Sequence, residues 1–134
     1  MATSIKPLKI VIVTPEKALL DEHADLIVLP MFDGERGVQP GHSAFVGQLG
    51  PGSLRMTSGS STKKFYVEGG FVQVRDNTVN VLTGKAVASE AINAEMVRKA
   101  EIAANAMPET NAVEKASKEK ALLRAKAMAR MSAA

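Results

Sequence analysis

The first part of the chain is a succession of short apolar runs closed by glycine, proline, asparagine or aspartate. Leu8–Val13 is a branched apolar run that ends at Thr14 and Pro15, which is typical of a strand followed by a turn. Val72 and Val74 alternate with polar residues, as expected for a half-buried strand. Strands are predicted over residues 8–13, 25–32, 43–49, 53–57, 63–70, 71–76 and 78–83. Strands this short and this closely spaced predict an antiparallel β-sandwich or flattened barrel.

Three turn signals refine this prediction. Pro30 lies inside an apolar run and lacks an N–H group, which favours an edge strand or a bulge there. Gly50-Pro51-Gly52 separates two runs and predicts a hairpin-like connection between them. Asp76-Asn77 supplies residues that tolerate positive φ, so a tight turn is expected at that point.

The pattern changes near residue 88, after which glycine is absent and alanine dominates. Asn93 is a suitable N-cap, because its side-chain oxygen can accept a free N–H of the first turn. Pro108 is expected to end this first helix, and a second helix is expected over residues 113–130. Two helices joined by a short loop form an antiparallel hairpin. The apolar stripe of the first helix is predicted to consist of Met96, Ala100, Ala103 and Met107.

The apolar stripe of this hairpin is thin. Alanine dominates it, and the larger contributors are expected to be Met96, Val97, Leu122, Leu123 and Met128. Because alanine burial contributes little per residue, the hairpin is expected to dock weakly on the rest of the chain. The fold class is therefore predicted as α+β, with a β-sandwich domain over residues 1–88 and a helical hairpin over residues 89–134.

The amino-acid composition limits the class of protein and its possible chemistry, but it does not indicate a function. The chain has 134 residues, of which 46% are hydrophobic and 23% charged, as in ordinary soluble domains. It has no cysteine, which excludes disulfides and thiolate chemistry. No signal peptide is expected at the N-terminus, and the longest apolar run, Leu26–Phe32, is too short to span a bilayer. The net charge is only +3, but the basic residues gather in the C-terminal segment 114–134, which favours an acidic partner.

No catalytic or metal site is expected. The chain has two histidines, His23 and His42. His23 is expected at an exposed strand end, and His42 is either a polar or packed structural residue or a partner contact. The acidic group Asp21, Glu22 and Asp25 lacks the spacing of a calcium loop, so a solvated edge is favoured. Neither glycine-rich segment matches a phosphate-binding loop. The sequence therefore indicates a protein that is not an enzyme and carries no cofactor.

Two segments carry a resemblance to a known family. They are "GERGVQPGHSAFVGQLGPGSLRM" and "FYVEGGFVQVRDNTVNVLTGKAV", followed by an alanine-rich basic helical pair. Together they resemble the epsilon subunit of bacterial F-type ATP synthase, from about Lys9 to Arg130. The resemblance implies a ten-stranded β-sandwich followed by a helical hairpin. It also implies a rotor subunit of the central stalk that lies peripherally at the cytoplasmic face of the bacterial plasma membrane.

The resemblance implies three protein partners. The turn-rich loop would contact the membrane c-ring through Glu35, Arg36, Pro40, Gly41 and His42, and another face of the sandwich would pack on the gamma subunit. The hairpin would either fold against the sandwich or extend along gamma toward the catalytic alpha/beta head, and when extended it would block ATP hydrolysis. Its basic residues Arg124, Lys126 and Arg130 would meet acidic segments there. A solvated basic face is the alternative for these three residues.

Two further expectations depend on this resemblance. Some family members bind ATP through an "[IL]-D-x-x-R-A" segment at the start of the first helix. Here Ile92 is followed by Asn93, Met96 and Val97 at the positions of the aspartate, arginine and alanine, so weak ATP binding is expected. The competing interpretation of the whole chain is a small nucleic-acid-binding β domain with a basic helical tail. Against it, aromatic residues make up only 4% of the chain, so stacking platforms are scarce.

Overall fold

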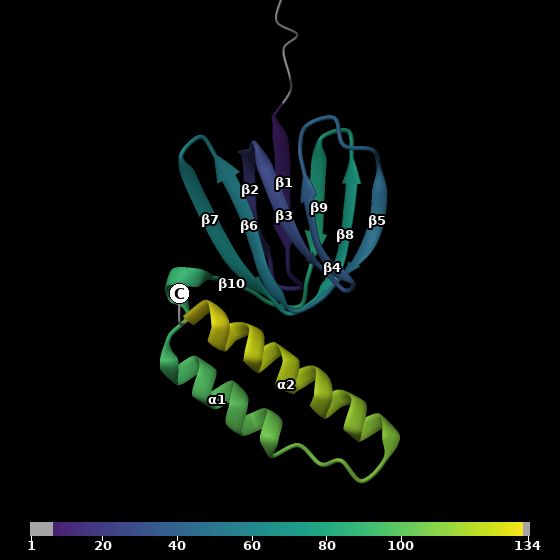
Figure 1. Ribbon diagram of the computed structural model, residues 1–134, viewed down its shortest axis with the longest axis vertical. Coiled ribbons are helices and arrows are strands. Elements are labelled where there is room, and N and C mark those ends of the chain that lie inside the picture. The colour runs from purple at the N-terminus through teal and green to yellow at the C-terminus, as the bar shows by residue number, and fades with distance from the viewer. Residues whose placement is uncertain (1–6, 133–134) are drawn as a thin grey trace, which may run out of the picture.

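The computed structural model describes residues 7–132 as a β-sandwich standing on a helical hairpin (Figure 1). The strands are β1 (Leu8–Val13), β2 (Ala18–Ala24), β3 (Leu26–Met31), β4 (Gly34–Val38), β5 (Phe45–Leu49), β6 (Gly52–Ser58), β7 (Ser61–Val67), β8 (Gly70–Arg75), β9 (Thr78–Leu82) and β10 (Ala86–Ala88). A short 3₁₀ turn (Ser89–Ala91) leads to α1 (Ala94–Asn105) and α2 (Ala112–Ser132). The predicted fold class is confirmed.

The strands form one 10-stranded sheet that coils on itself in the order β10-β7-β6-β3-β5-β8-β9-β1-β2, with β4 paired to β3. Every described pairing is antiparallel except one: β1 runs parallel to β9, with Lys9 opposite Thr78. The sequence predicted an antiparallel sandwich or flattened barrel and gave no sign of this one parallel pair. Parallel neighbours need a long connection, and the strands between β1 and β9 provide it.

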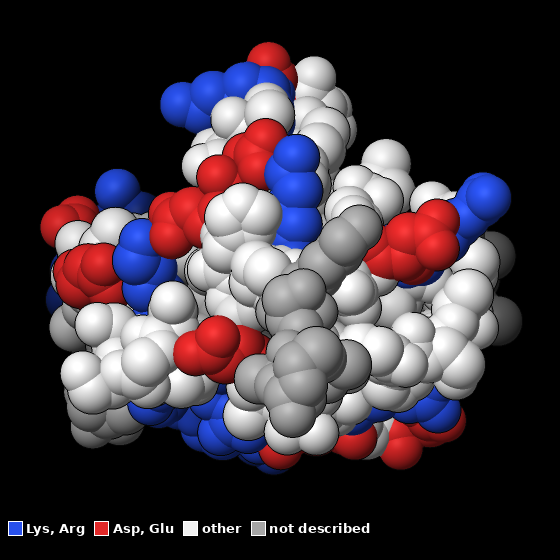
Figure 2. All heavy atoms as spheres, turned by 90° about the horizontal axis from the view of Figure 1, so that it is seen from above, with Lys and Arg blue, Asp and Glu red and all other residues white. Residues whose placement is uncertain are grey.

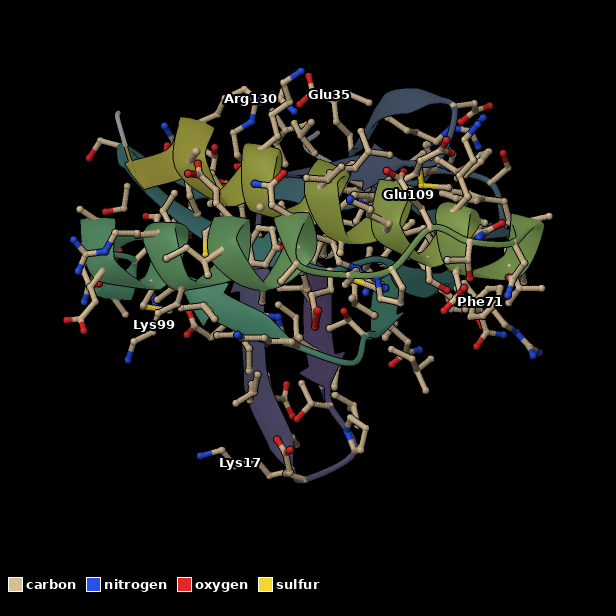
Figure 3. All side chains as sticks on the ribbon, turned by 90° about the horizontal axis from the view of Figure 1, so that it is seen from below. Lys17, Glu35, Phe71, Lys99, Glu109 and Arg130 are labelled. Atoms are coloured by element: carbon tan, nitrogen blue, oxygen red, sulfur yellow. The ribbon has the colours of Figure 1, made fainter. Side chains whose placement is uncertain are left out.

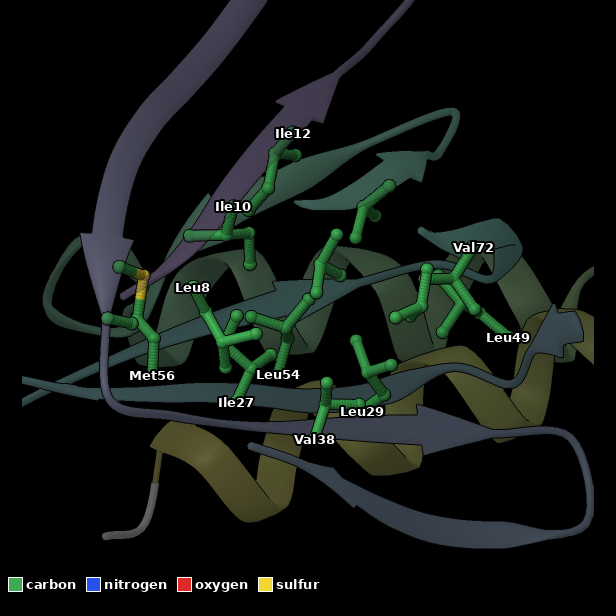
Figure 4. Close-up of a cluster of buried hydrophobic side chains, with 14 of the residues drawn as sticks. Leu8, Ile10, Ile12, Ile27, Leu29, Val38, Leu49, Leu54, Met56 and Val72 are labelled. Atoms are coloured by element: carbon green, nitrogen blue, oxygen red, sulfur yellow. The ribbon is translucent and has the colours of Figure 1, made fainter. Parts of the chain in front are cut away.

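The core lies between the two halves of this sheet (Figure 4). Alternate residues of each strand point inward, so that Leu8, Ile10 and Ile12 of β1 are fully buried. The same period of two buries Val72 and Val74 in β8. Aliphatic residues from β1 to β9 fill this space almost entirely, and the helices contribute none of its members. The sandwich thus has a core of its own.

The connection at Gly50-Pro51-Gly52 is not a hairpin, contrary to the prediction. Strands β5 and β6 do not pair with each other, because each pairs antiparallel with β3. The three residues bend the chain between the two halves of the sandwich. The Gly50 N–H donates to the Pro30 carbonyl at 2.8 Å, so this bend is fastened to β3.

Pro30 does not mark an edge strand, because β3 lies inside the sheet with β4 on one side and β5 and β6 on the other. The proline instead stands where the partner of β3 changes from β6 to β5. A residue without an N–H group is tolerated there because the ladder is already interrupted. The tight turn at Asp76-Asn77 is confirmed, with φ values of 50° and 59°.

Three strands were not identified from the sequence. β2 is largely exposed, and its sequence ALLDEHA has no apolar alternation; β4 contains two glycines and two charged residues; β10 has only three residues. The segment around Gly34 was expected to be a turn-rich loop, but Gly34–Val38 pairs with β3 in a hairpin. Pairing with an established neighbour has overridden weak local propensity in each case.

The two helices form the predicted antiparallel hairpin below the sandwich (Figure 1). Asn93 caps α1 as expected: its Oδ1 accepts the Met96 N–H at 2.9 Å. Asn111 plays the same part for α2, where its Oδ1 accepts the Glu114 N–H at 2.9 Å. α1 ends at Asn105, so Met107 lies beyond the helix.

The predicted apolar stripes were partly wrong. Ala104, rather than Ala103, is the buried alanine of α1. On α2, Met128 is buried, but Leu122 and Leu123 are 36% and 54% exposed. The inward face of α2 is formed by alanines at positions 125 and 127 together with Met128, because small side chains allow α2 to lie close to the sandwich.

Candidate partner-binding surfaces

The loop of residues 39–44 joins β4 to β5 at the end of the sandwich far from the helices (Figure 1). It contains the predicted ring-contact residues Pro40, Gly41 and His42. The Gly41 N–H donates to Asn77 Oδ1 at 2.7 Å, so the β8–β9 turn holds the middle of the loop. Gly41 has φ +87°, a conformation that other residues rarely adopt. The loop is therefore fixed by its neighbour rather than by its own sequence.

The side chains of Arg36 and His42 both pack against the aromatic ring of Phe45. The Arg36 guanidinium carbon lies 4.6 Å from the centroid of the Phe45 ring, and the His42 ring centroid lies 5.3 Å from it. The His42 Nδ1 atom is also 2.8 Å from the Ser43 carbonyl oxygen. A cation above an aromatic face and a tilted ring pair are both favourable arrangements. His42 is thus a packed loop residue, and no carboxylate or serine hydroxyl within residues 7–132 bonds to its ring.

Glu35 does not belong to this group. Successive residues of a strand point to opposite faces, so Glu35 and Arg36 diverge. Arg55 Nη2 donates to both Glu35 carboxylate oxygens at 3.3 Å. Seen from below, Glu35 lies beside Arg130 of α2 (Figure 3). The structure therefore brings together four of the five predicted ring-contact residues and separates the fifth.

The end of the sandwich that carries this loop has no large patch of one charge. Acidic and basic side chains are interspersed around it (Figure 2). Long-range electrostatic attraction depends on a field of one sign, which this face does not display. A partner at this end would be recognised through short-range contacts with the loop.

The three basic residues predicted on α2 have different surroundings. Lys126 and Arg130 are exposed and lie four residues apart, on one side of the helix. Arg124 is half-buried: its Nε donates to the Glu68 carbonyl at 3.3 Å and lies 3.9 Å from the Glu68 carboxylate. Arg124 therefore contacts the sandwich in this arrangement, while Lys126 and Arg130 are available to solvent.

Tyr66, which sequence reasoning missed, is the centre of the contact between hairpin and sandwich. It is 1% exposed and packs with Ile92, Ala127 and Met128. Burial, and secondarily the Glu68 carboxylate, raises the pKa of Tyr66 to about 12, although Arg124 opposes the shift. The signal in the sequence was faint: Tyr66 is the single tyrosine of the chain, on a strand position facing away from the main core.

A row of exposed apolar residues crosses the outer face of the sheet. Val13 of β1 lies opposite Leu82 of β9, and Leu82 lies opposite Phe71 of β8. Phe71 is 59% and Leu82 54% exposed, and Val46 on β5, which lies opposite Gln73 and is thus a diagonal neighbour of Phe71, is also exposed. We call these four residues the apolar row. The sequence already indicated this row. Phe71 and Leu82 alternate with buried valines and therefore face outward, where polar residues are usual.

Within residues 7–132, no group of three or more histidine, aspartate or glutamate side chains is arranged to hold a metal ion. Neither α1 nor α2 is long and apolar enough to cross a membrane.

Comparison with known proteins agrees with this architecture. Residues 7–89 match the family model of the ATP synthase delta/epsilon chain β-sandwich domain. The ATP synthase epsilon chain of Rhodopirellula baltica is 41% identical over 93% of this chain and 98% of its own length. That of Nitratidesulfovibrio vulgaris is 42% identical over 71% of each chain.

Solved structures show the same fold with the helices included. A chain of the Euglena gracilis mitochondrial ATP synthase, in an assembly of OSCP, F1 and c-ring, superposes with a TM-score of 0.78 at 27% identity, covering 92% of this chain and 80% of that one. A chain of the Tetrahymena thermophila ATP synthase central stalk and c-ring superposes with a TM-score of 0.76 at 19% identity, covering 97% and 99%. The chain belongs to the family of ATP synthase epsilon chains.

Proposed function

We propose that this chain is a non-catalytic rotor subunit of the ATP synthase central stalk, which joins the gamma subunit to the c-ring and limits ATP hydrolysis through α2. Membership of the epsilon family supports the first part, and so does the likeness to a chain within an F1 and c-ring assembly. The chain would lie peripherally at the cytoplasmic face of the bacterial plasma membrane, with residues 1–88 and 89–134 acting as two domains.

The observation that carries this proposal is the apolar row. Val13, Val46, Phe71 and Leu82 are exposed on one face of the sheet, where contact with water is unfavourable. Contiguous exposed apolar side chains mark interaction surfaces more often than chance. We assign this row to the gamma subunit, because a permanent contact between rotor subunits needs apolar burial rather than charge alone.

The ring contact is assigned to the end of the sandwich far from the helices (Figure 1). Pro40, Gly41 and His42 project there on a loop fixed by Asn77, and Arg36 lies against the same Phe45 ring as His42. A loop held from both sides transmits force with little deformation. Glu35 was included in this contact from the sequence, but its pairing with Arg55 supports a role in orienting β4.

The inhibitory role is assigned to the exposed basic face of α2. Lys126 and Arg130 are available for an acidic surface of the catalytic head. Arg124 would join them only after leaving Glu68. Since each exposed ion pair contributes only about 0.5–1 kcal/mol, several of them are needed to hold an extended helix.

Binding of the gamma subunit tests the proposal. The double change Phe71→Ser and Leu82→Ser should weaken binding to gamma strongly, because it replaces half of the apolar row by polar groups. Gln73→Ser is the matched control, since Gln73 is exposed on the same strand but is already polar. Equal binding by all three proteins, measured by calorimetry, would reject the assignment of this face.

The nucleic-acid alternative has less support. Lys9 and Arg75 share the outward face of the sheet with Phe71, but among the described residues Phe71 is the one exposed aromatic ring on that face of β8, β9 and β1. Single-strand binders use a sheet face with several stacking aromatics beside basic side chains. One exposed ring does not meet this requirement.

A further inference from the structure

We propose that the ion pair between Glu22 and Lys63 protects the two free edges of the sheet from pairing with a second copy of this chain. The sheet has two ends, because its strand order runs from β10 to β2 without closing. A free strand edge presents N–H and C=O groups with which another chain can pair. The proposal concerns the isolated chain and is independent of the proposed function.

Two strands have a free edge within the described residues. β2 pairs with β1 on one side only. β10 pairs with residues 65–67 of β7, so residues 61–64 of β7 are paired only with β6. β2 also lies against β6, and the Lys63 side chain reaches it from β7. The two free edges therefore face each other along one line, which we call the seam.

Both charged residues lie on the core side of their strands. Residues directly opposite each other in an antiparallel pair share one face of the sheet. Glu22 lies opposite Ile10 of β1, which is fully buried. Lys63 lies opposite Met56 of β6, which also belongs to the main core. Natural sheets use such inward charges on edge strands to prevent strand addition, because an added strand would enclose the charge.

The two charges meet across the seam. Lys63 Nζ donates to both carboxylate oxygens of Glu22, at 2.7 and 3.0 Å. One end of the seam is closed by the backbone, where the Asp25 N–H donates to the Thr57 carbonyl at 2.7 Å. Among residues 7–132, no other hydrogen bond or ion pair joins β2 to β6 or β7. The ion pair is therefore the polar link that spans the seam beside β2.

A second copy can add a strand to either edge only by separating this pair. The added strand would then cover charges that have lost their partner, and an enclosed charge without a partner is costly. The pair itself is partly exposed, with Glu22 at 39% and Lys63 at 55%, so it contributes little to the stability of the fold. Its main effect should be on association rather than on folding.

The test removes both charges from the full chain. Glu22→Val with Lys63→Val makes the core side of both edges apolar and introduces a residue type that favours strands. This variant should associate, so that its average mass in sedimentation rises from that of a monomer toward that of a dimer as the concentration increases. Glu16→Val with Lys17→Val makes the same changes at exposed positions between β1 and β2 and should stay monomeric, like the unaltered chain.

Swapping the two charges tests the pairing itself. Glu22→Lys alone places two cations across the seam, so the amides of β2 should exchange hydrogen about two- to fivefold faster, as expected for the loss of one exposed ion pair. Glu22→Lys with Lys63→Glu restores the pair and should restore both the slow exchange and the monomeric state.

Two results would overturn the proposal. One is a valine variant that unfolds cooperatively in urea, as a folded chain does, but stays monomeric at every concentration. The other is a swapped variant whose β2 amides exchange as fast as those of Glu22→Lys. If the valine variant does not fold, the comparison of Glu22→Lys with the swapped variant decides alone.

Discussion

The Nε atom of Arg124 donates to the backbone carbonyl of Glu68 at 3.3 Å and lies 3.9 Å from its carboxylate. Arg124 belongs to α2 and Glu68 to the connection between β7 and β8, so this contact joins the hairpin to the sandwich. A guanidinium engaged here cannot at the same time meet an acidic surface elsewhere. The docked and inhibitory uses of Arg124 exclude each other.

Glu68→Gln should release the hairpin more often. The change removes the carboxylate charge, but it keeps the size of the side chain and the backbone carbonyl. A partly exposed ion pair contributes about 0.5–1 kcal/mol, so the open population should rise about two- to fivefold. Hydrogen exchange of α2 amides in the isolated chain measures this rise. Glu101→Gln, an exposed change on α1, is the control, and identical exchange in both variants would exclude a role for the Glu68 carboxylate.

Tyr66 offers a direct optical measure of docking. It is the single tyrosine and the chain has no tryptophan, so the ultraviolet absorbance of tyrosinate reports this residue alone. With its pKa raised to about 12, the phenol stays neutral well above its ordinary value of about 10. The docked state favours the neutral phenol, so the contribution of Tyr66 to docking is complete below about pH 10 and is lost as pH rises through about 12.

A variant with a displaced hairpin should titrate at the ordinary value. Ala127→Glu places a charge in the buried cluster around Tyr66 and should move the midpoint down toward about pH 10. Ala116→Glu makes the same change at an exposed position of α2 and should leave the midpoint unchanged. A midpoint near pH 10 in the unaltered chain would mean that Tyr66 is not covered in solution.

A chain truncated after Ala88 should fold cooperatively. The main core contains residues of β1 to β9 and none of the helices. Ile10→Ala in the truncated chain should lower the free energy of unfolding by about 2–5 kcal/mol, the usual cost of a large-to-small change at a buried site. Urea denaturation followed by circular dichroism measures both the cooperativity of unfolding and its free energy. Absence of a cooperative transition in the truncated chain would show that the hairpin is needed for the sandwich.

The ring contact should depend on Arg36 and not on Glu35. Arg36→Ala removes a cation from the Phe45 ring beside the β4–β5 loop and should weaken attachment to c-ring membranes. Glu35→Ala removes only the pair with Arg55 and should have little effect. His42→Ala should leave ATP hydrolysis by the soluble head unchanged, because no proton transfer is assigned to it. Loss of ring attachment in Glu35→Ala alone would reverse the assignment.

Charge reversal on α2 should relieve inhibition. Changing Lys126 and Arg130 together to glutamate should raise ATP hydrolysis by a head assembled with this subunit, nearly as much as deleting residues 114–134. Lys99→Glu on α1 is the matched control. High salt should also weaken inhibition by the unaltered subunit, since screening shortens to about 3 Å at 1 M. If the reversed subunit inhibits fully, packing of the exposed Leu122 and Leu123 becomes the explanation.

The sequence correctly predicted the strands, turn and helix start that are specified by strong local patterns. Alternating valines marked β8 and β9, Asp76-Asn77 marked their turn, and Asn93 marked the start of α1. It missed β2 and β4, because these strands are specified by pairing with a neighbour rather than by their own side chains.

The candidate surfaces were predictable to a smaller extent. Glu35 and Arg36 are adjacent in sequence, but strand alternation sends them to different neighbours. Tyr66 and Glu68 became visible only when the fold placed α2 beside β7. An interface formed by segments far apart in the chain is not indicated by the pattern of neighbouring residues in either segment.

The parallel pairing of β1 with β9 has a consequence for biosynthesis. During translation β1 emerges first and can pair at once with β2, but its other edge has no partner until β9 has left the ribosome (Figure 1). A ribosome that pauses between β2 and β9 would hold β1 with one edge unpaired, and an open edge of an apolar strand is prone to association with other nascent chains. The helices are made last, so the sandwich can close before the hairpin exists.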